Sequence, residues 1–251
     1  MKRHAAWAAL VAVGGCAVMG GPRVETAQTG EMVLRATKPL SFADAAQAAY
    51  GDSTLGRAVA RLAHLPYDDG LPRGAVLVLP VRERLQARVH EEEAADREFQ
   101  LGLAAADVGS YHRAADHFRE ALRAAPNRID VRYNLGLALM QAGELTEATE
   151  VLETVALARP DDAESRYAFG SLLRRRRAYV RAYQEFDAAL RADRSHTKAA
   201  FARAKTLEDL EKWDRAERAW REFLADFPDD PLADNARRSL EGLPGKRAAQ
   251  S

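Results

Sequence analysis

The sequence predicts a mainly α-helical protein, in which a small strand–helix–helix–strand domain precedes a solenoid of helical hairpins. Small residues recur at intervals of 34: Gly102, Gly136, Gly170 and Ala204. Large apolar residues recur at the same interval: Phe118, Leu152, Phe186 and Trp220. Prolines end three of the four units: Pro126, Pro160 and Pro228. A hairpin of this length cannot bury its apolar face alone, so neighbouring units must stack.

This period, with its small residues and terminal prolines, resembles the tetratricopeptide repeat, and the resemblance implies a binding surface for other proteins. The four expected units cover 95–128, 129–162, 163–196 and 197–230, with turns at Gly109, Gly143, Arg177 and Glu211. We expect a connecting helix over 82–94, because apolar residues there are four apart. A last helix over 231–243 should cap unit four, and residues 244–251 should fray.

The N-terminus has the pattern of an export signal over residues 1–15. Lys2 and Arg3 precede a short apolar run, and the chain's only cysteine is Cys16. The stretch Val13-Gly14-Gly15-Cys16 resembles a bacterial lipobox, which implies that Cys16 is lipidated and anchors the protein at the periplasmic face of the outer membrane. A signal peptide cleaved elsewhere is the alternative. Residues 16–31 contain several glycines and predict a flexible tether.

Residues 32–81 predict a strand, two helices and a closing strand. Tyr50-Gly51-Asp52, Leu65-Pro66 and the run from Gly74 to Pro80 resemble a lysin-motif (LysM) domain. The resemblance implies that the first strand–helix loop and the second helix–strand loop contact peptidoglycan. The corresponding candidates are Ser41, Phe42 and Asp69. The alternative is a domain that serves as a spacer or a protein contact.

Candidate partner-binding residues lie on the first helix of each unit. One aromatic series has the 34-residue period: Phe99, Tyr133, Tyr167 and Phe201. These rings either line a groove for a peptide, where aromatic residues dominate binding, or pack inward. Polar candidates on the same helices are Asn134, Gln141, Arg174, Arg175, Lys198 and Lys205. The basic group around Arg174 is either a solvated helix end or a dock for an acidic peptide.

The composition gives no sign of nucleic-acid binding or catalysis. The 37 basic and 37 acidic residues balance, so no overall charge draws the chain to nucleic acid. No His-Glu-x-x-His, Gly-x-Ser-x-Gly or phosphate-binding glycine loop occurs. We therefore expect a binding protein without cofactor or metal, and no enzyme. Its expected role is a lipid-anchored scaffold; an assembly chaperone or pilotin of a pilus or secretion machine, or chiefly a wall-binding tether, are the alternatives.

Overall fold

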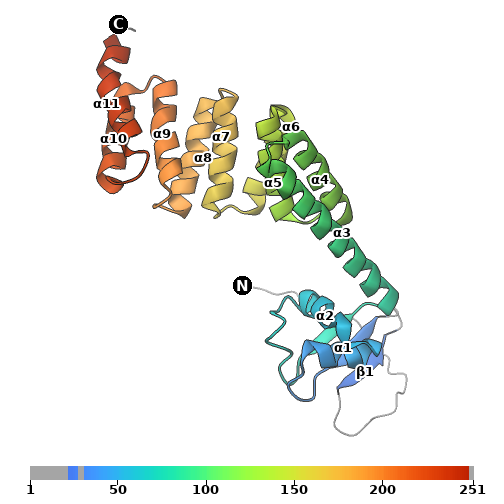
Figure 1. Ribbon diagram of the computed structural model, residues 1–251. Helices are drawn as coiled ribbons and strands as arrows, with labels where there is room; N and C mark the ends of the chain where they lie inside the picture. Colours follow the sequence, from blue (N-terminus) through green and yellow to red (C-terminus); the bar gives the residue numbers. More distant parts are fainter. Residues whose placement is uncertain (1–21, 28–30, 249–251) are drawn as a thin grey trace. The chain divides into compact units, whose positions relative to one another are not determined.

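A computed structural model describes residues 22–27 and 31–248, which divide between residues 93 and 94 into two compact units. The export signal and Cys16 lie outside the described residues. Within the described ranges, no helix is long and apolar enough to cross a membrane. Helix α3, Arg82–Asp107, runs through the boundary between the units (Figure 1).

The first unit contains a three-stranded antiparallel sheet in the order β1-β2-β3, formed by Arg23–Thr26, Met32–Arg35 and Val76–Leu79. Helix α1 (Phe42–Tyr50), the short 3-10 helix Ser53–Leu55 and helix α2 (Gly56–Ala63) lie between β2 and β3 in sequence. The expected strand–helix–helix–strand order is therefore present.

Strand β1 corrects the prediction of a flexible tether over 16–31. Val24 pairs with Leu34 of β2 and packs against the core of the unit. Burial of Val24 favours the strand although the neighbouring glycines suggest a loop.

Local capping fixes the helices of the first unit. Ser41 caps α1 by accepting a hydrogen bond of 3.0 Å from the backbone N–H of Asp44. Gly51 ends α1 in the left-handed conformation, with φ of 68°. The Tyr50 hydroxyl donates to the carbonyl of Pro80 at 2.9 Å, which ties α1 to the residue after β3.

The second unit is a row of helical hairpins, shown in Figure 1 from α3 to α11. Each of four hairpins pairs a first helix with a second one. The pairs are α3 with α4 (Tyr111–Ala124), α5 (Ile129–Ala142) with α6 (Leu145–Ala158), α7 (Ala163–Arg175) with α8 (Tyr179–Ala192), and α9 (Thr197–Asp209) with α10 (Trp213–Asp226). Helix α11, Ala233–Ala248, packs against α10.

Two boundaries differ from the predicted ones. The expected connecting helix over 82–94 is not separate, because no helix breaker occurs between Arg82 and Asp107 and α3 is continuous. The expected frayed tail over 244–251 begins too early, since α11 continues past Pro244 to Ala248. Leu243 is buried and the Lys246 ammonium binds Glu208, so contacts with the preceding hairpin hold this last turn.

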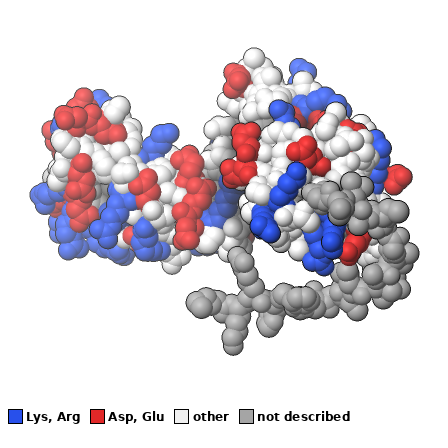
Figure 2. Space-filling model, turned by 90° about the horizontal axis from the view of Figure 1, so that it is seen from below, with Lys and Arg blue, Asp and Glu red and all other residues white. Residues whose placement is uncertain are grey.

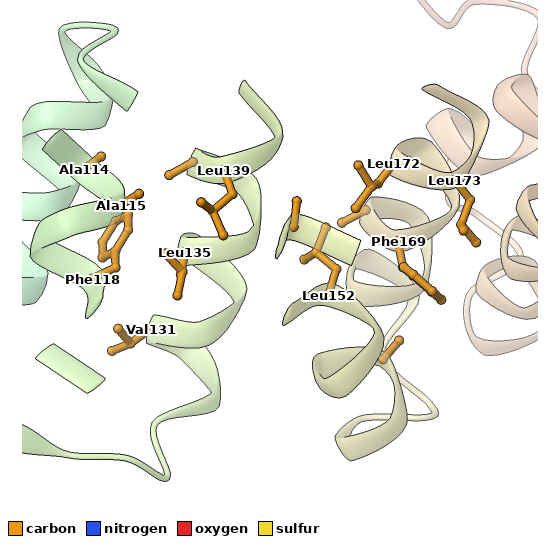
Figure 3. Close-up of a cluster of buried hydrophobic side chains, with 14 of the residues drawn as sticks. Ala114, Ala115, Phe118, Val131, Leu135, Leu139, Leu152, Phe169, Leu172 and Leu173 are labelled. Atoms are coloured by element: carbon orange, nitrogen blue, oxygen red, sulfur yellow. The ribbon is translucent and has the colours of Figure 1, made fainter. Parts of the chain in front are cut away.

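The 34-residue period arises from the packing within each hairpin. A Cβ atom on Gly102 would lie 2.5 Å from the Phe118 ring, and one on Gly136 would lie 2.5 Å from Leu152. The glycines therefore admit large side chains from the second helix. Figure 3 shows Val131 and Leu135 of α5 pointing toward Phe118 of α4, so the core continues from one hairpin into the next.

The contact between units three and four is more polar than the earlier ones. The buried core of the second unit consists of one cluster over units one to three and another over unit four and α11. Arg203 stands where the repeat has Leu135 and Phe169 in earlier units. Its guanidinium lies 3.2 Å from Glu222 and 3.6 Å from Asp187 of α8. Ion pairs thus replace apolar packing at this contact.

Candidate functional site

The four periodic aromatic residues all pack within their own hairpins and stay partly exposed. Each lies 19 residues before a large buried side chain of the second helix. Ring centroids are 5.8 Å apart for Phe99 and Phe118, and 4.8 Å apart for Phe201 and Trp220. One part of each ring therefore joins the core and the rest lies at the surface. The two interpretations drawn from the sequence each describe part of this arrangement.

Two of these rings line a pocket of about 550 Å³ on the side of the first helices. Helices α7 and α9, with Phe186 of α8 and the segment before α11, form its walls. The lining residues are Tyr167, Ser171, Arg174, Phe186, Thr197, Lys198, Phe201, Ala202, Lys205, Asp230, Pro231 and Leu232. The pocket therefore combines two aromatic rings with three cationic side chains.

The three cations differ in their partners. Arg174 Nε lies 2.6 Å from Asp209 Oδ2, and Lys205 Nζ lies 3.0 Å from Glu208 Oε2. Lys198 is exposed and has no ion-pair partner within the part of the chain that the structure describes. Its ammonium is therefore available to an anionic ligand. The pocket's carboxylate, Asp230, accepts a hydrogen bond from the backbone N–H of Leu232 at 2.8 Å.

The other predicted groove residues lie outside the pocket lining. The Asn134 amide donates to the carbonyl of Asp130 at 2.9 Å within its own helix, and the Arg175 guanidinium donates to the carbonyl of Met140. Gln141 is exposed at the end of α5. These side chains stabilise helix ends rather than join the pocket.

The remaining two rings have charged neighbours. The guanidinium carbon of Arg128 lies 5.2 Å from the centre of the Phe99 ring. The Tyr133 hydroxyl donates to Glu164 at 3.3 Å. Burial, followed by the charge of Glu164, raises the pKa of Tyr133 well above its ordinary value. Tyr133 therefore stays neutral at physiological pH.

Sequence reasoning missed the wall formed by Asp230, Pro231 and Leu232. The period contains the signal, because Leu232 lies 34 residues after Lys198 and so occupies the corresponding position of an incomplete fifth unit. Only the apolar residues of this segment were expected to matter, as part of a capping helix. The structure adds that they close one side of the pocket.

The first unit brings its two candidate loops together. Leu40 and Leu71 form an isolated antiparallel bridge, so the segments with Ser41 and Asp69 lie side by side. Both of these residues are exposed. Phe42 is fully buried, which corrects its expected role in direct glycan contact: it belongs to the core. The exposed ring beside these loops is Tyr67, whose centroid lies 6.4 Å from that of Phe42.

The electrostatic character of the described surface is mixed. Acidic and basic side chains are interspersed over the face drawn in Figure 2. Among the described residues, no group of three or more His, Cys, Asp or Glu side chains is arranged to hold a metal ion. The pocket between α7 and α9 is consequently the best candidate for a functional site.

Comparisons with known proteins agree with the repeat architecture. The family model described as "Tetratricopeptide repeat" matches residues 105–168, and the one described as "Anaphase-promoting complex, cyclosome, subunit 3" matches residues 153–223. Curated protein sequences gave no match.

Solved structures share the fold of the helical part. The structure "YrrB: a TPR protein with an unusual peptide-binding site" is 25% identical, with a TM-score of 0.53 over 62% of this chain and 77% of that one. A tetratricopeptide repeat protein from Parabacteroides merdae is 23% identical, with a TM-score of 0.56 over 66% and 67% of the two chains. MamA from Desulfovibrio magneticus RS-1 is 22% identical, with a TM-score of 0.53 over 57% and 81%. The helical part of this chain thus consists of tetratricopeptide-type repeats, a scaffold for protein interaction.

Proposed function

We propose that this chain is a lipid-anchored scaffold at the periplasmic face of the outer membrane, where its pocket between α7 and α9 holds an acidic segment of a partner protein. The pocket's chemistry carries the proposal. Lys198 offers an unpaired ammonium, and Tyr167 and Phe201 offer partly exposed rings in the same cavity. A carboxylate next to an apolar side chain would satisfy both features. The proposal includes no catalytic activity.

The size of the cavity suits a few side chains rather than a whole folded domain. About 550 Å³ falls within the range of sites that enclose compact ligands. A peptide would therefore be held by one or two anchor residues, with flanking residues along the first helices. The structurally similar protein YrrB is described as having a peptide-binding site, which makes a peptide a reasonable occupant of the pocket proposed here.

Affinity purification from the native host tests the pocket. Lys198→Glu reverses the charge of the unpaired lysine and should reduce recovery of the partner about tenfold, the effect of losing about 1.4 kcal/mol. Lys212→Glu makes the same change at an exposed residue outside the pocket lining and should leave recovery unchanged. Equal recovery with both variants would rule out the charged part of the proposal.

The aromatic part has its own matched pair. Tyr167→Ala removes a ring from the pocket, whereas Tyr133→Ala removes the ring at the same repeat position outside the lining. Both side chains are partly buried, so thermal unfolding of each variant is measured alongside recovery. A greater loss of partner with Tyr167→Ala at similar stability supports the pocket, and the reverse order refutes it.

The anchoring proposal rests on the sequence around Cys16. Two or more acyl chains hold a protein stably at a membrane, whereas one does not. Growth with a radiolabelled fatty acid should label the protein, and Cys16→Ser should abolish both the label and its recovery in the outer-membrane fraction. A protein that sediments with membranes without label would overturn the proposal.

We also propose that the first unit is LysM-like and contacts peptidoglycan through the adjoining loops of Ser41 and Asp69. The bridge between Leu40 and Leu71 supports this proposal, as does the exposed ring of Tyr67, because aromatic faces suit sugar rings. The full chain should sediment with purified peptidoglycan, and Tyr67→Ala should reduce the fraction that sediments. Sedimentation that is absent, or unchanged by the substitution, would favour a spacer.

An assembly chaperone or pilotin is the second candidate. The pocket favours it equally, because such a protein also binds a peptide segment of its client. Expression of the Cys16→Ser chain in a host that lacks the protein separates the two ideas. A chaperone would restore assembly without the anchor, whereas the scaffold requires the anchor.

A further inference from the structure

The first hairpin of the second unit has an uncovered end face on α3. Arg97, Leu101, Ala104 and Val108 follow one another at spacings of four, three and four residues, which places them on one side of the helix. Leu101 is 50% exposed and Val108 is 76% exposed. Both are large apolar side chains, which a stable hairpin stack normally covers.

The later hairpins show what this face is built for. The residues 34 and 68 positions after Leu101 are Leu135 and Phe169, which are 4% and 2% exposed. Those that follow Ala104 are Ala138 and Leu172, and both are buried. Figure 3 shows that Leu135 points toward α4, the second helix of the preceding hairpin. The same face of α3 is therefore shaped for a helix, and no hairpin precedes α3 in the described part of the chain.

The geometry of the stack specifies the direction of the missing helix. Successive helices α4 and α5 are joined by a short turn and run antiparallel, so this face accepts an antiparallel neighbour. A second copy of α3 fits that requirement. When two copies pair antiparallel about a twofold axis near residues 102 and 103, Leu101 of one copy meets Ala104 of the other. The small side chain of Ala104 leaves room for Leu101.

Charge complementarity selects the same partner. In this arrangement Arg97 of one copy approaches Asp107 of the other, and the symmetry makes the contact twice. Neither residue has an ion-pair partner among the described residues, and both are exposed. Within one chain the two side chains are ten residues apart on one helix, about 15 Å, which is too far for an ion pair.

We propose that the chain forms a symmetric homodimer through the Arg97–Val108 face of α3. A single helix face buries less than the roughly 800 Å² per partner of a stable interface. The dimer is therefore weak and depends on concentration. It leaves the pocket between α7 and α9 open, because none of the pocket's residues lies on α3.

Two differently tagged full-length chains, co-expressed and extracted in excess detergent, test the proposal. Capture of one tag should recover the other. Leu101→Glu in both chains should lower that recovery at least about tenfold, since two buried leucines are lost per dimer. Leu157→Glu introduces the same change at another exposed leucine, outside α3, and should have no effect.

A charge exchange makes the test specific for the pairing. Arg97→Asp and Asp107→Arg should each weaken co-purification, and the chain with both changes should regain it, because the pair is reformed with its signs exchanged. Failure of the double variant to recover overturns the antiparallel arrangement. Recovery of the second tag that is absent with the native chain, or insensitive to Leu101→Glu, overturns the dimer. Capture of a different protein on this face overturns the choice of occupant.

Discussion

Glu208 offers the sharpest test of how the end of the stack is held together. Its side chain is 3% exposed and accepts hydrogen bonds from Trp220 Nε1 at 2.9 Å and from Lys205 Nζ at 3.0 Å. The Lys246 ammonium of α11 binds the same carboxylate. One buried anion therefore joins α9, α10 and α11.

The substitution Glu208→Gln keeps the shape of the side chain and removes its charge. The amide oxygen can still accept from Trp220, but the amide nitrogen faces two ammonium groups. A net charge-assisted hydrogen bond contributes about 1.5–3 kcal/mol. Lys205 and Lys246 are 32% and 44% exposed and recover solvation, so the lower end of that range applies to each. We expect the free energy of unfolding to fall by about 2 kcal/mol.

Urea unfolding followed by circular dichroism at pH 7 measures this change. With a slope of about 2 kcal/mol per molar urea, the midpoint should fall by about 1 M. Glu241→Gln makes the same change at an exposed position of α11 and should shift the midpoint only slightly. An equal effect of the two substitutions would refute the role assigned to Glu208.

The pH dependence provides a second measurement of the same network. Burial opposes the charge of Glu208, but hydrogen bonds from Lys246, Lys205 and Trp220 outweigh it and lower its pKa below the ordinary 4.5. The stabilisation is therefore complete above pH 4.5 and is lost as the pH falls through the lowered value. Because glutamine does not titrate, the difference between native and Glu208→Gln proteins should shrink below about pH 4. A difference that stays constant with pH would contradict this assignment.

Two further predictions concern packing and titration. Gly136→Ala should lower the free energy of unfolding by about 1 kcal/mol, because overpacking against Leu152 exceeds the gain in helix propensity; Gly242→Ala, with open space around it, should raise it by about 0.5–1 kcal/mol, and the same sign for both in urea unfolding would refute the argument. Burial raises the pKa of Tyr50 to about 12, so stability that depends on its bond to Pro80 should decline between pH 10 and pH 12. Tyr50→Phe should remove that decline in alkaline unfolding curves, and an unchanged decline would assign it to other groups.

Much of the helical architecture could be predicted because each hairpin repeats one packing relation. A ring on the first helix meets a large side chain 19 residues later, and this fixes the period. The period even located turns where the residue type gives no hint. Arg177 and Glu211 adopt left-handed conformations, with φ of 62° and 58°, at positions where other hairpins have glycine.

The features that sequence reasoning missed depend on distant contacts. Strand β1 forms because Val24 finds a place beside Leu34, which no local pattern reveals. The last turn of α11 persists past Pro244 because Glu208 lies within reach of Lys246. For the candidate site, the period gave positions along the helices but no side-chain directions. Tyr167 and Tyr133 therefore looked equivalent, although the pocket includes only Tyr167.

The arginine between units three and four gives the stack a hinge that responds to ionic strength. Dissolved salt screens attractions between partly exposed charges and leaves apolar contacts largely intact, so this joint loosens before the earlier ones. The pocket straddles it, with Arg174 on one side and Lys198 on the other. An occupant that touches both banks would lock the hinge. Its arrival should then slow amide hydrogen exchange in α10 and α11, well beyond the residues that it contacts.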